Sequence, residues 1–349
     1  MARKNTKNES KLNYREEIRR LKELGPQRLY LLWGPEDYLR EQYLSQLRSL
    51  CLPEGEDSFS FRRMDGPELD LQELADAIDA MPFLTERSFV EIRDAELNKA
   101  KDPDELLRLL SDIPAYCTVA LVQGVQYEPD GRLKLTRALR ERAVELKFTQ
   151  QPQGAMVDWI ARRFAAAGKR IELEAAQRLI FISGDLMNRL IPEIEKVAAY
   201  ARGDTVTVDD VEAVANHIPE AVVFAMTDHI AKKEYNAALS VLSELLSDRA
   251  NEPIAMLAVL GGQMRRLYAA RLAADRLLGQ SELMEICGIS YESIANRLIA
   301  SARGFTLPQL TRAVELCEEA DYQMKSSGTD DVALLKEVVL RIIAGESHA

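Results

Sequence analysis

The sequence predicts an α/β domain built on a mainly parallel sheet, followed by two regions that are helical throughout. Three observations predict this arrangement. Short apolar segments alternate with amphipathic helical patterns through the first 150 residues, the strand signals stop after Gln151-Pro152, and long amphipathic patterns fill the chain from Pro219 onward. Strands that alternate with helices are typical of a parallel sheet covered on both faces, because parallel neighbours need a crossover connection.

The first region contains segments with the length and the β-branched or aromatic content of strands. These segments are LYLLW (29–33), SFSFRRM (58–64), SFVEIRD (88–94), TVALVQG (118–124) and VELKFT (144–149). Helical patterns separate them at residues 37–50, 69–80, 103–111 and 130–142. Asp102 or Asp104 is expected to cap the third of these helices, and Asp130 the fourth, because a carboxylate can accept a hydrogen bond from the free N–H groups of a first turn.

The rest of the chain has helical patterns only. A small helical domain is predicted from residues 153–167, 172–182, 185–201 and 207–216, the last opened by Thr207 with Asp209 and Asp210 in its first turn. Breaks in the final region are expected near residues 248–253, 279, 288, 304–308 and 326–329. The chain therefore divides into an α/β domain at 11–150, a helical domain at 151–218 and a helical region at 219–349, with residues 1–10 expected to be a disordered tail.

Composition and charge limit the classes of function. The chain has 349 residues, of which 47% are hydrophobic and 29% charged, as in folded proteins. Its polar, basic start has no apolar segment behind it, and no run approaches 18 apolar residues, so we expect neither a signal peptide nor a membrane span and place the protein in the cytoplasm. The net charge of -11 argues against a protein that coats nucleic acid by bulk electrostatics, so any DNA contact must be local.

The cysteines and histidines show no pattern of a metal or redox site. The four cysteines lie far apart without a C-x-x-C pair, and the three histidines have no second ligand at a familiar spacing. We therefore expect no disulfide framework, no metal site and no histidine catalysis. The residues concerned are Cys51, Cys117, Cys287, Cys317, His217, His229 and His348.

The segment LLWGPEDYLRE (31–41) stands where a nucleotide-binding protein would have its phosphate loop. Such a loop needs G-x-x-x-x-G-K-[ST], in which backbone N–H groups surround the phosphates, the lysine neutralises charge and the hydroxyl holds magnesium. With Gly34 at the first position, Leu39, Arg40 and Glu41 occupy the other three, and none has the required chemistry. The loop also carries carboxylates at residues 36 and 37, which would repel a triphosphate. An ordinary strand-to-helix turn with no bound nucleotide is therefore expected.

The second half of an ATPase site is missing as well. It would consist of an apolar strand that ends in two acidic residues for magnesium, whereas SFVEIRD ends in Arg93 and Asp94. No catalytic residue and no cofactor are expected.

An apolar pair, Phe83 and Leu84, lies in the stretch LADAIDAMPFLTERSF between a helix and a strand. Pro82 disfavours helix at Met81, so the helix is expected to end there and to leave the pair outside its packed face. Two interpretations remain from the residues alone. The pair folds back onto the core, or it forms an exposed plug for a pocket on a partner, where burying each side chain stabilises the complex by about 1.5 to 3 kcal/mol.

Along nearly its whole length the chain resembles the delta subunit of the bacterial DNA polymerase III clamp loader. The resemblance rests on LYLLWGPEDYLREQ near the start, MPFLTERSFVEIRD, SGDLMNRLIPEIEKVAAYARG followed by VTVDDVEAV, and VFAMTDHIAKKEYNAALSVLSELL with ADYQMKSSG in the last region. It implies an AAA+-like first domain, a helical lid domain and a helical collar domain that joins a five-subunit ring.

The resemblance also implies a function. The family does not hydrolyse ATP itself, and its clamp-binding pair falls on Phe83 and Leu84, flanked by Met81 and Pro82. The pair enters a pocket on the sliding clamp, the beta subunit, and favours the open form. The implied partners are the tau/gamma motor subunits, delta-prime and primed DNA within the DNA polymerase III holoenzyme. Movements of the motor subunits expose or hide this face, and a higher affinity for the open clamp shifts its population.

DNA-contact residues are harder to assign. The last region carries more acidic than basic residues, and Arg265, Arg266 and Arg271 do not share one helical face. These arginines are explained equally well as solvent-exposed residues, as residues of a subunit interface or as DNA contacts. Lys325 is a better candidate because we expect it in a turn between helices, where a lysine can reach phosphates, although this stretch fits a purely structural turn too.

Two other classes of function are open at this point. An active AAA+ ATPase has only the α/β pattern in its favour. A stand-alone DNA-binding regulator is disfavoured by the acidity of the chain and by the lack of a basic recognition helix.

Overall fold

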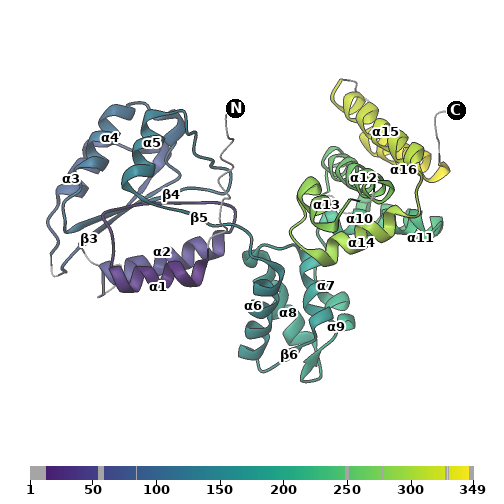
Figure 1. Ribbon diagram of the computed structural model, residues 1–349, viewed down its shortest axis with the longest axis horizontal. Coiled ribbons are helices and arrows are strands. Elements are labelled where there is room, and N and C mark those ends of the chain that lie inside the picture. Colours follow the sequence, from purple (N-terminus) through teal and green to yellow (C-terminus); the bar gives the residue numbers. More distant parts are fainter. Residues whose placement is uncertain are drawn as a thin grey trace. The chain divides into compact units, whose positions relative to one another are not determined.

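The computed structural model describes residues 13–53, 59–83, 85–247, 251–276, 278–326, 328 and 330–345. The chain divides into two compact units (Figure 1). The first contains residues 1–150 and 186–188, and the second contains residues 151–185 and 189–349. The expected tail at residues 1–10 lies outside the described part of the chain.

A five-stranded parallel sheet forms the centre of the first unit, with strand order β2-β3-β4-β1-β5. The strands are β1 (Leu29–Trp33), β2 (Phe61–Asp65), β3 (Ser88–Arg93), β4 (Cys117–Val122) and β5 (Val144–Lys147). The predicted α/β fold class, with a parallel sheet followed by helical regions, is confirmed.

The inner strands β1 and β4 read as unbroken apolar runs because both of their faces are covered. Every residue of these two strands is buried, and they pair in parallel with Leu29 opposite Val119. The edge strand β2 is instead exposed at Arg62, Arg63 and Asp65, and Met64 is its one buried residue. A continuous apolar run is typical of a strand inside a parallel sheet.

Helices cover both faces of this sheet (Figure 1). Helices α1 and α2 lie on one face, and α3, α4 and α5 lie on the other. The helices are α1 (Tyr14–Leu24), α2 (Asp37–Cys51), α3 (Leu71–Asp79), α4 (Pro103–Ser111) and α5 (Lys134–Arg142), with short 3₁₀ turns η1 (Gly66–Glu68) and η2 (Leu97–Lys99).

The helix caps agree with the sequence only in part. The Asp102 carboxylate accepts a hydrogen bond from the Glu105 N–H at 3.0 Å and caps α4, as predicted. The cap predicted at Asp130 is wrong, because its carboxylate instead binds the Arg132 N–H at 2.9 Å in a turn, and α5 begins only at Lys134. Helix α1 was not predicted; the Asn13 side chain caps it.

The second unit begins with α6 (Gln153–Ala166), α7 (Leu173–Ser183), α8 (Met187–Tyr200) and α9 (Val208–Val214). The Thr207 hydroxyl accepts from the Asp210 N–H at 3.4 Å while the Asp210 carboxylate accepts from the Thr207 N–H at 2.9 Å. This capping box confirms the predicted start of α9. The prediction that no strand follows residue 152 is wrong, since β6 (Arg170–Ile171) and β7 (Thr205–Val206) form a short parallel pair.

The chain ends in long packed helices. Their ends confirm the five predicted breaks, but a further break at residues 232–234 was not predicted. The helices are α10 (Pro219–Ala231), α11 (Tyr235–Ser247), α12 (Pro253–Asp275), α13 (Gln280–Cys287), α14 (Glu292–Ala302), α15 (Leu307–Ser326) and α16 (Asp331–Ala344). Their shared core includes Met264 and Leu267 of α12 and Leu310 of α15, all fully buried. Within the described residues, no helix is both long and apolar enough to cross a membrane.

Candidate functional site

The turn after β1 is held by the neighbouring strand rather than shaped around a ligand. The Phe148 N–H donates to the Trp33 carbonyl at 2.7 Å, and the Glu36 N–H donates to the Phe148 carbonyl at 3.1 Å. Between them Gly34 has φ +117°, and a Cβ there would lie 2.3 Å from the Phe148 carbonyl oxygen. The glycine is therefore required by the close approach of two backbones.

The side chains at the key positions of the phosphate loop point elsewhere. Leu39 is buried in the core. Arg40 is also buried, and its guanidinium donates to the Gly34 carbonyl at 2.8 Å and pairs with Asp37. A phosphate loop presents N–H groups and a positive charge to its ligand. Here the guanidinium of Arg40 is instead bound by the Gly34 carbonyl and the Asp37 carboxylate.

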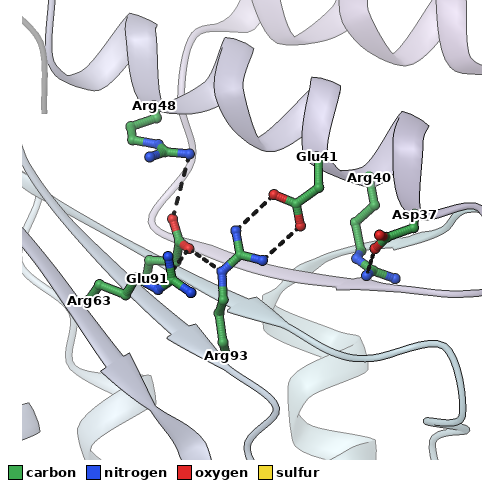
Figure 2. Close-up of polar contacts among 7 residues, drawn as sticks. All are labelled: Asp37, Arg40, Glu41, Arg48, Arg63, Glu91 and Arg93. Atoms are coloured by element: carbon green, nitrogen blue, oxygen red, sulfur yellow. Dashed lines mark hydrogen bonds and ion pairs between the residues drawn. The ribbon is translucent and has the colours of Figure 1, made fainter. Parts of the chain in front are cut away.

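Glu41, at the position of the magnesium-binding hydroxyl, turns toward β3 (Figure 2). The Arg93 guanidinium binds its carboxylate through Nη1–Oε1 and Nη2–Oε2, both 2.8 Å long. Arg93 Nε also donates to Glu91 Oε1 at 2.5 Å. Arg93 thus joins β3 to α2 through Glu41 and also binds Glu91 on its own strand.

Glu91 is almost completely buried and is surrounded by positive charge. Besides Arg93, the Arg48 guanidinium lies 3.8 Å from Glu91 Oε2 and the Arg63 guanidinium 3.9 Å from Oε1 (Figure 2). A buried carboxylate needs such compensation, because removing it from water without a partner costs several kcal/mol. The network places three guanidinium groups around Glu91 in the region between α2 and β3.

The ion pairs shift two pKa values. Burial alone raises the pKa of Glu41, but the hydrogen bonds and charge of Arg93 outweigh it and lower the pKa of this carboxyl. The hydrogen bonds with Glu41, followed by those with Glu91, raise the pKa of the Arg93 guanidinium. Both groups therefore remain charged at neutral pH.

The segment between α3 and β3 carries the predicted apolar pair. Helix α3 ends at Asp79, two residues before the expected end at Met81. The Met81 side chain is 81% exposed and the Phe83 side chain 62% exposed, while Pro82 is half-buried. The structure does not describe Leu84. Phe83 therefore does not fold back onto the core.

A second exposed aromatic residue lies beside Phe83, and sequence reasoning missed it. The Phe59 ring, 77% exposed, meets the Phe83 ring edge-on with centroids 6.4 Å apart. Between this residue and β2, the Ser60 hydroxyl accepts a hydrogen bond from the Phe83 N–H at 3.1 Å. Phe59 was missed because the sequence predicted a strand at 58–64. Side chains of a strand inside such a sheet normally lie against one of two covered faces, so Phe59 was not expected to be exposed.

The candidate DNA contacts lie on helices of the second unit. Arg265 and Arg266 are exposed on α12. The prediction that Lys325 lies in a turn is wrong: it is in the last turn of α15, where its ammonium pairs with Asp321 at 2.7 Å. Helix formation continues through Ser326, whose hydroxyl bonds the Tyr322 carbonyl at 2.6 Å.

Metal and thiol chemistry have little support in the described residues. No group of three or more His, Cys, Asp or Glu side chains among them could hold a metal ion. Burial raises the pKa of Cys51 to about 11 and that of Cys317 to about 12, which keeps these thiols protonated and unreactive. His217 and His229 each lie beside a glutamate, at 3.4 Å from Glu212 and 2.7 Å from Glu234.

Comparison with known proteins gives consistent matches in both units. Residues 30–149 match the family model described as DNA polymerase III, delta subunit, and residues 220–342 match DNA polymerase III delta subunit, C-terminal domain. The two ranges together make up more than half of the chain. The matched parts include the turn after β1, the exposed tip and the packed C-terminal helices.

Relatives and a solved structure extend the similarity over most of the chain. The DNA polymerase III subunit delta of Bacillus subtilis is 26% identical over 325 residues, which cover 90% of this chain and 92% of the relative. A probable DNA polymerase III subunit delta of Aquifex aeolicus is 22% identical over 334 residues, with 89% and 90% covered. The structure of the Bacillus subtilis DNA clamp loader delta protein shares the fold, with a TM-score of 0.57, 22% identity and coverage of 95% of this chain and 99% of that one.

Proposed function

This chain belongs to the family of DNA polymerase III delta subunits, and from that premise we propose that it binds the sliding clamp through Phe83 and Leu84 and favours the open form. As a member of this family it is a subunit of the DNA polymerase III clamp loader. The proposal concerns what the subunit contributes to that assembly. We assign it the opening of the clamp rather than a reaction of its own.

The observation that carries the proposal is the exposed tip between α3 and β3. Met81 and Phe83 stand largely in solvent at the end of a helix, although each would stabilise a fold by burial. Large apolar side chains that remain exposed together mark interaction sites. Burying a phenylalanine and a leucine in a pocket stabilises a complex by about 1.5 to 3 kcal/mol each, or roughly two to four decades of affinity before association costs.

Clamp opening follows from unequal affinity. A ligand shifts an equilibrium between two forms only by the difference between its binding free energies for them. If the pocket for Phe83 and Leu84 is better shaped in the open clamp, binding raises the open population by that ratio, and a factor of 100 in affinity changes the populations by the same factor. Motor subunits that expose or cover the tip then decide when this happens.

The turn after β1 supports a subunit that does not bind or hydrolyse ATP. Arg40 is committed to Asp37 and to the Gly34 carbonyl, and Glu41 to Arg93. An ATPase would need these positions for the terminal phosphates and magnesium. Equilibrium dialysis with labelled ATP tests this directly: saturable micromolar binding to the isolated chain would favour an active AAA+ ATPase instead.

The remaining partners and the division of the chain are part of the same proposal. Residues 11–150 form the AAA+-like domain, residues 151–218 the lid and residues 219–349 the collar, which contacts the tau/gamma motor subunits and delta-prime. Lys325, Arg265 and Arg266 contact primed DNA in the assembled complex. No cofactor is required, and the protein works in the cytoplasm.

Binding of the purified chain to its sliding clamp tests the main claim. We compare the wild type with the Phe83→Ala, Leu84→Ala double variant by surface plasmon resonance and expect at least about a hundredfold weaker binding, since two buried anchors are lost. A matched control replaces two other exposed apolar residues of the same unit, Leu24→Ala with Val125→Ala, and should bind like the wild type. Equal affinity of the wild type and the tip variant would reject the assignment.

A further inference from the structure

We propose that the dipeptide Phe59-Ser60, directly before β2, forms a second half of the clamp-binding tip, in which Phe59 extends the apolar contact surface and Ser60 holds the backbone of Phe83. The inference rests on the clamp binding proposed above, and it adds two residues from a segment distant in sequence. Phe59 is assigned a direct contact with the clamp. Ser60 is assigned a positioning role.

Phe59 belongs to the tip because of its exposure and its contact with Phe83. The two rings are 24 residues apart in sequence, yet they meet edge-to-face with an interplanar angle of 82°. Both rings remain mostly exposed after making this contact. A single exposed aromatic residue is ordinary, but two that contact each other form an apolar surface of the kind that anchors protein interfaces. The exposed Met81 lies two residues before Phe83 in the sequence.

Ser60 fixes the direction in which Phe83 points. Its side chain is buried, and its hydroxyl accepts from the Phe83 N–H at 3.1 Å and lies 3.3 Å from the Phe83 carbonyl oxygen. The Thr85 hydroxyl lies 2.8 Å from the Ser60 hydroxyl and 2.8 Å from the Arg87 carbonyl. The buried Ser60 hydroxyl thus contacts the backbone N–H and carbonyl of Phe83 and the side chain of Thr85. It ties this segment to the residue directly before β2.

Such anchoring matters because the tip is a connection between a helix and a strand. A free connection of this length would lose conformational entropy when it enters a pocket, and that loss weakens binding. Hydrogen bonds that already hold the Phe83 backbone in the free subunit reduce the loss. The same bonds place the Phe83 ring against Phe59, so both rings can enter one pocket together.

The clamp suits this surface better than a second copy of the chain. Side chains as exposed as Phe59, Met81 and Phe83 project from the surface and need a hollow in the partner. A symmetric dimer would require the same patch to serve as both projection and hollow. The continuity of Phe59 with Phe83 assigns it to the same pocket that the proposed function gives to Phe83.

The test is a set of variants measured for binding to the sliding clamp. We expect Phe59→Ala and Ser60→Ala each to weaken binding about tenfold, as does loss of a typical interface anchor. The Ser60→Ala effect should largely vanish in a Phe83→Ala background, because the serine then has no ring to position. Leu24→Ala, which removes a similarly exposed side chain from the end of α1, should leave the affinity unchanged.

The outcomes separate this inference from the proposed function. If Phe83→Ala binds the clamp weakly while Phe59→Ala and Ser60→Ala bind it like the wild type, the inference fails. The assignment of Phe83 to clamp binding then stands. If Phe83→Ala binds like the wild type too, the proposed function itself fails. If Ser60→Ala folds poorly, Thr85→Ala replaces it, because this variant removes the hydrogen bond between the Thr85 and Ser60 hydroxyls. Its loss of clamp affinity must also largely vanish in a Phe83→Ala background. A wild-type dimer that dissociates on Phe59→Ala in sedimentation velocity would assign the patch to a second copy and overturn the inference.

Discussion

Arg93 of β3 and Glu41 of α2 form a two-bonded ion pair, Nη1–Oε1 and Nη2–Oε2, each 2.8 Å (Figure 2). The pair joins two elements of the first unit, α2 and β3, that an ATPase would use for phosphate and magnesium. Parallel hydrogen bonds between a guanidinium and a carboxylate fix orientation as well as distance. Here they fix α2 against the sheet and give a structural use to positions that lack the chemistry of nucleotide binding.

Removing the guanidinium should destabilise the first unit. We expect Arg93→Met to lower the free energy of unfolding by about 3 kcal/mol, because Glu91 would remain buried with only the more distant Arg48 and Arg63. The measurement is chemical denaturation followed by Trp33 fluorescence in a Trp159→Phe background, which leaves the first unit as the source of signal. Adding Glu91→Gln should restore part of the loss, since it neutralises the buried group.

An exposed ion pair provides the control for this prediction. Arg108 pairs with Glu105 at 2.7 Å on α4, and both side chains are largely exposed. Arg108→Met should leave the free energy of unfolding almost unchanged, because exposed ion pairs contribute little to stability. If the two arginine variants lose the same stability, the network around Glu91 does not hold the unit together.

The lowered pKa of Glu41 predicts how stability depends on pH. A carboxyl with a lower pKa in the folded state binds fewer protons than in the unfolded state, so its contribution is present above the unfolded value near 4.5 and is lost as pH falls through the lower folded value. Urea denaturation of the wild type and Glu41→Gln should therefore differ most at pH 6 to 7, with the wild type more stable. The difference should shrink steadily below about pH 4.5. A difference that grows on acidification would contradict the pKa direction.

Local patterns were sufficient for the inner strands and most helix boundaries. LYLLW coincides with β1 and the pattern at 103–111 coincides with α4, because burial on both faces and an N-terminal aspartate are properties of neighbouring residues. Helix α1 escaped notice since its sequence YREEIRRLKEL is mostly polar, with Leu21 its one fully buried residue. Its support comes from packing on α2, which is a tertiary property.

The candidate site was predictable to the same limited extent. The defects at Leu39, Arg40 and Glu41 are visible as a failed motif, and the position of Phe83 after Pro82 marks it as a residue outside a helix. The partners of these residues are not visible, because Glu41 and Arg93 are 52 residues apart and Ser60 and Phe83 are 23 apart. Periodicity describes one element at a time, so a hydrogen bond between elements has no sequence signal in a single chain.

Gly34 should tolerate no side chain, because the backbone at Phe148 lies too close to it. Gly34→Ala places a Cβ at a φ of +117° and 2.3 Å from the Phe148 carbonyl oxygen. We expect a loss of at least about 3 kcal/mol, from backbone strain and displacement of β5. Denaturation followed by circular dichroism measures it. Gly288→Ala is the control: its φ is also positive, at +62°, but no atom lies within 4 Å of the new Cβ, so a loss of about 1 kcal/mol is expected.

Lys325 gives a prediction about the assembled clamp loader. In the last turn of α15 its ammonium pairs with Asp321, and both side chains are largely exposed. Such a pair contributes only about 0.3 to 0.5 kcal/mol to helix stability, so Lys325→Ala should fold normally. If the lysine contacts a phosphate, the variant should weaken binding to primed DNA for all sequences and reduce the slope of log affinity against log salt by about one.

The control for the DNA prediction is a lysine of the same region on another helix. Lys336 is exposed on α16, and Lys336→Ala changes the net charge by the same amount. Because bulk charge acts at long range while phosphate contact is local, only the Lys325 variant should lower the salt slope. Fluorescence anisotropy with labelled primed DNA at several salt concentrations measures both. Equal slopes for the two variants would leave Lys325 as a solvated residue that stabilises the end of α15 through Asp321.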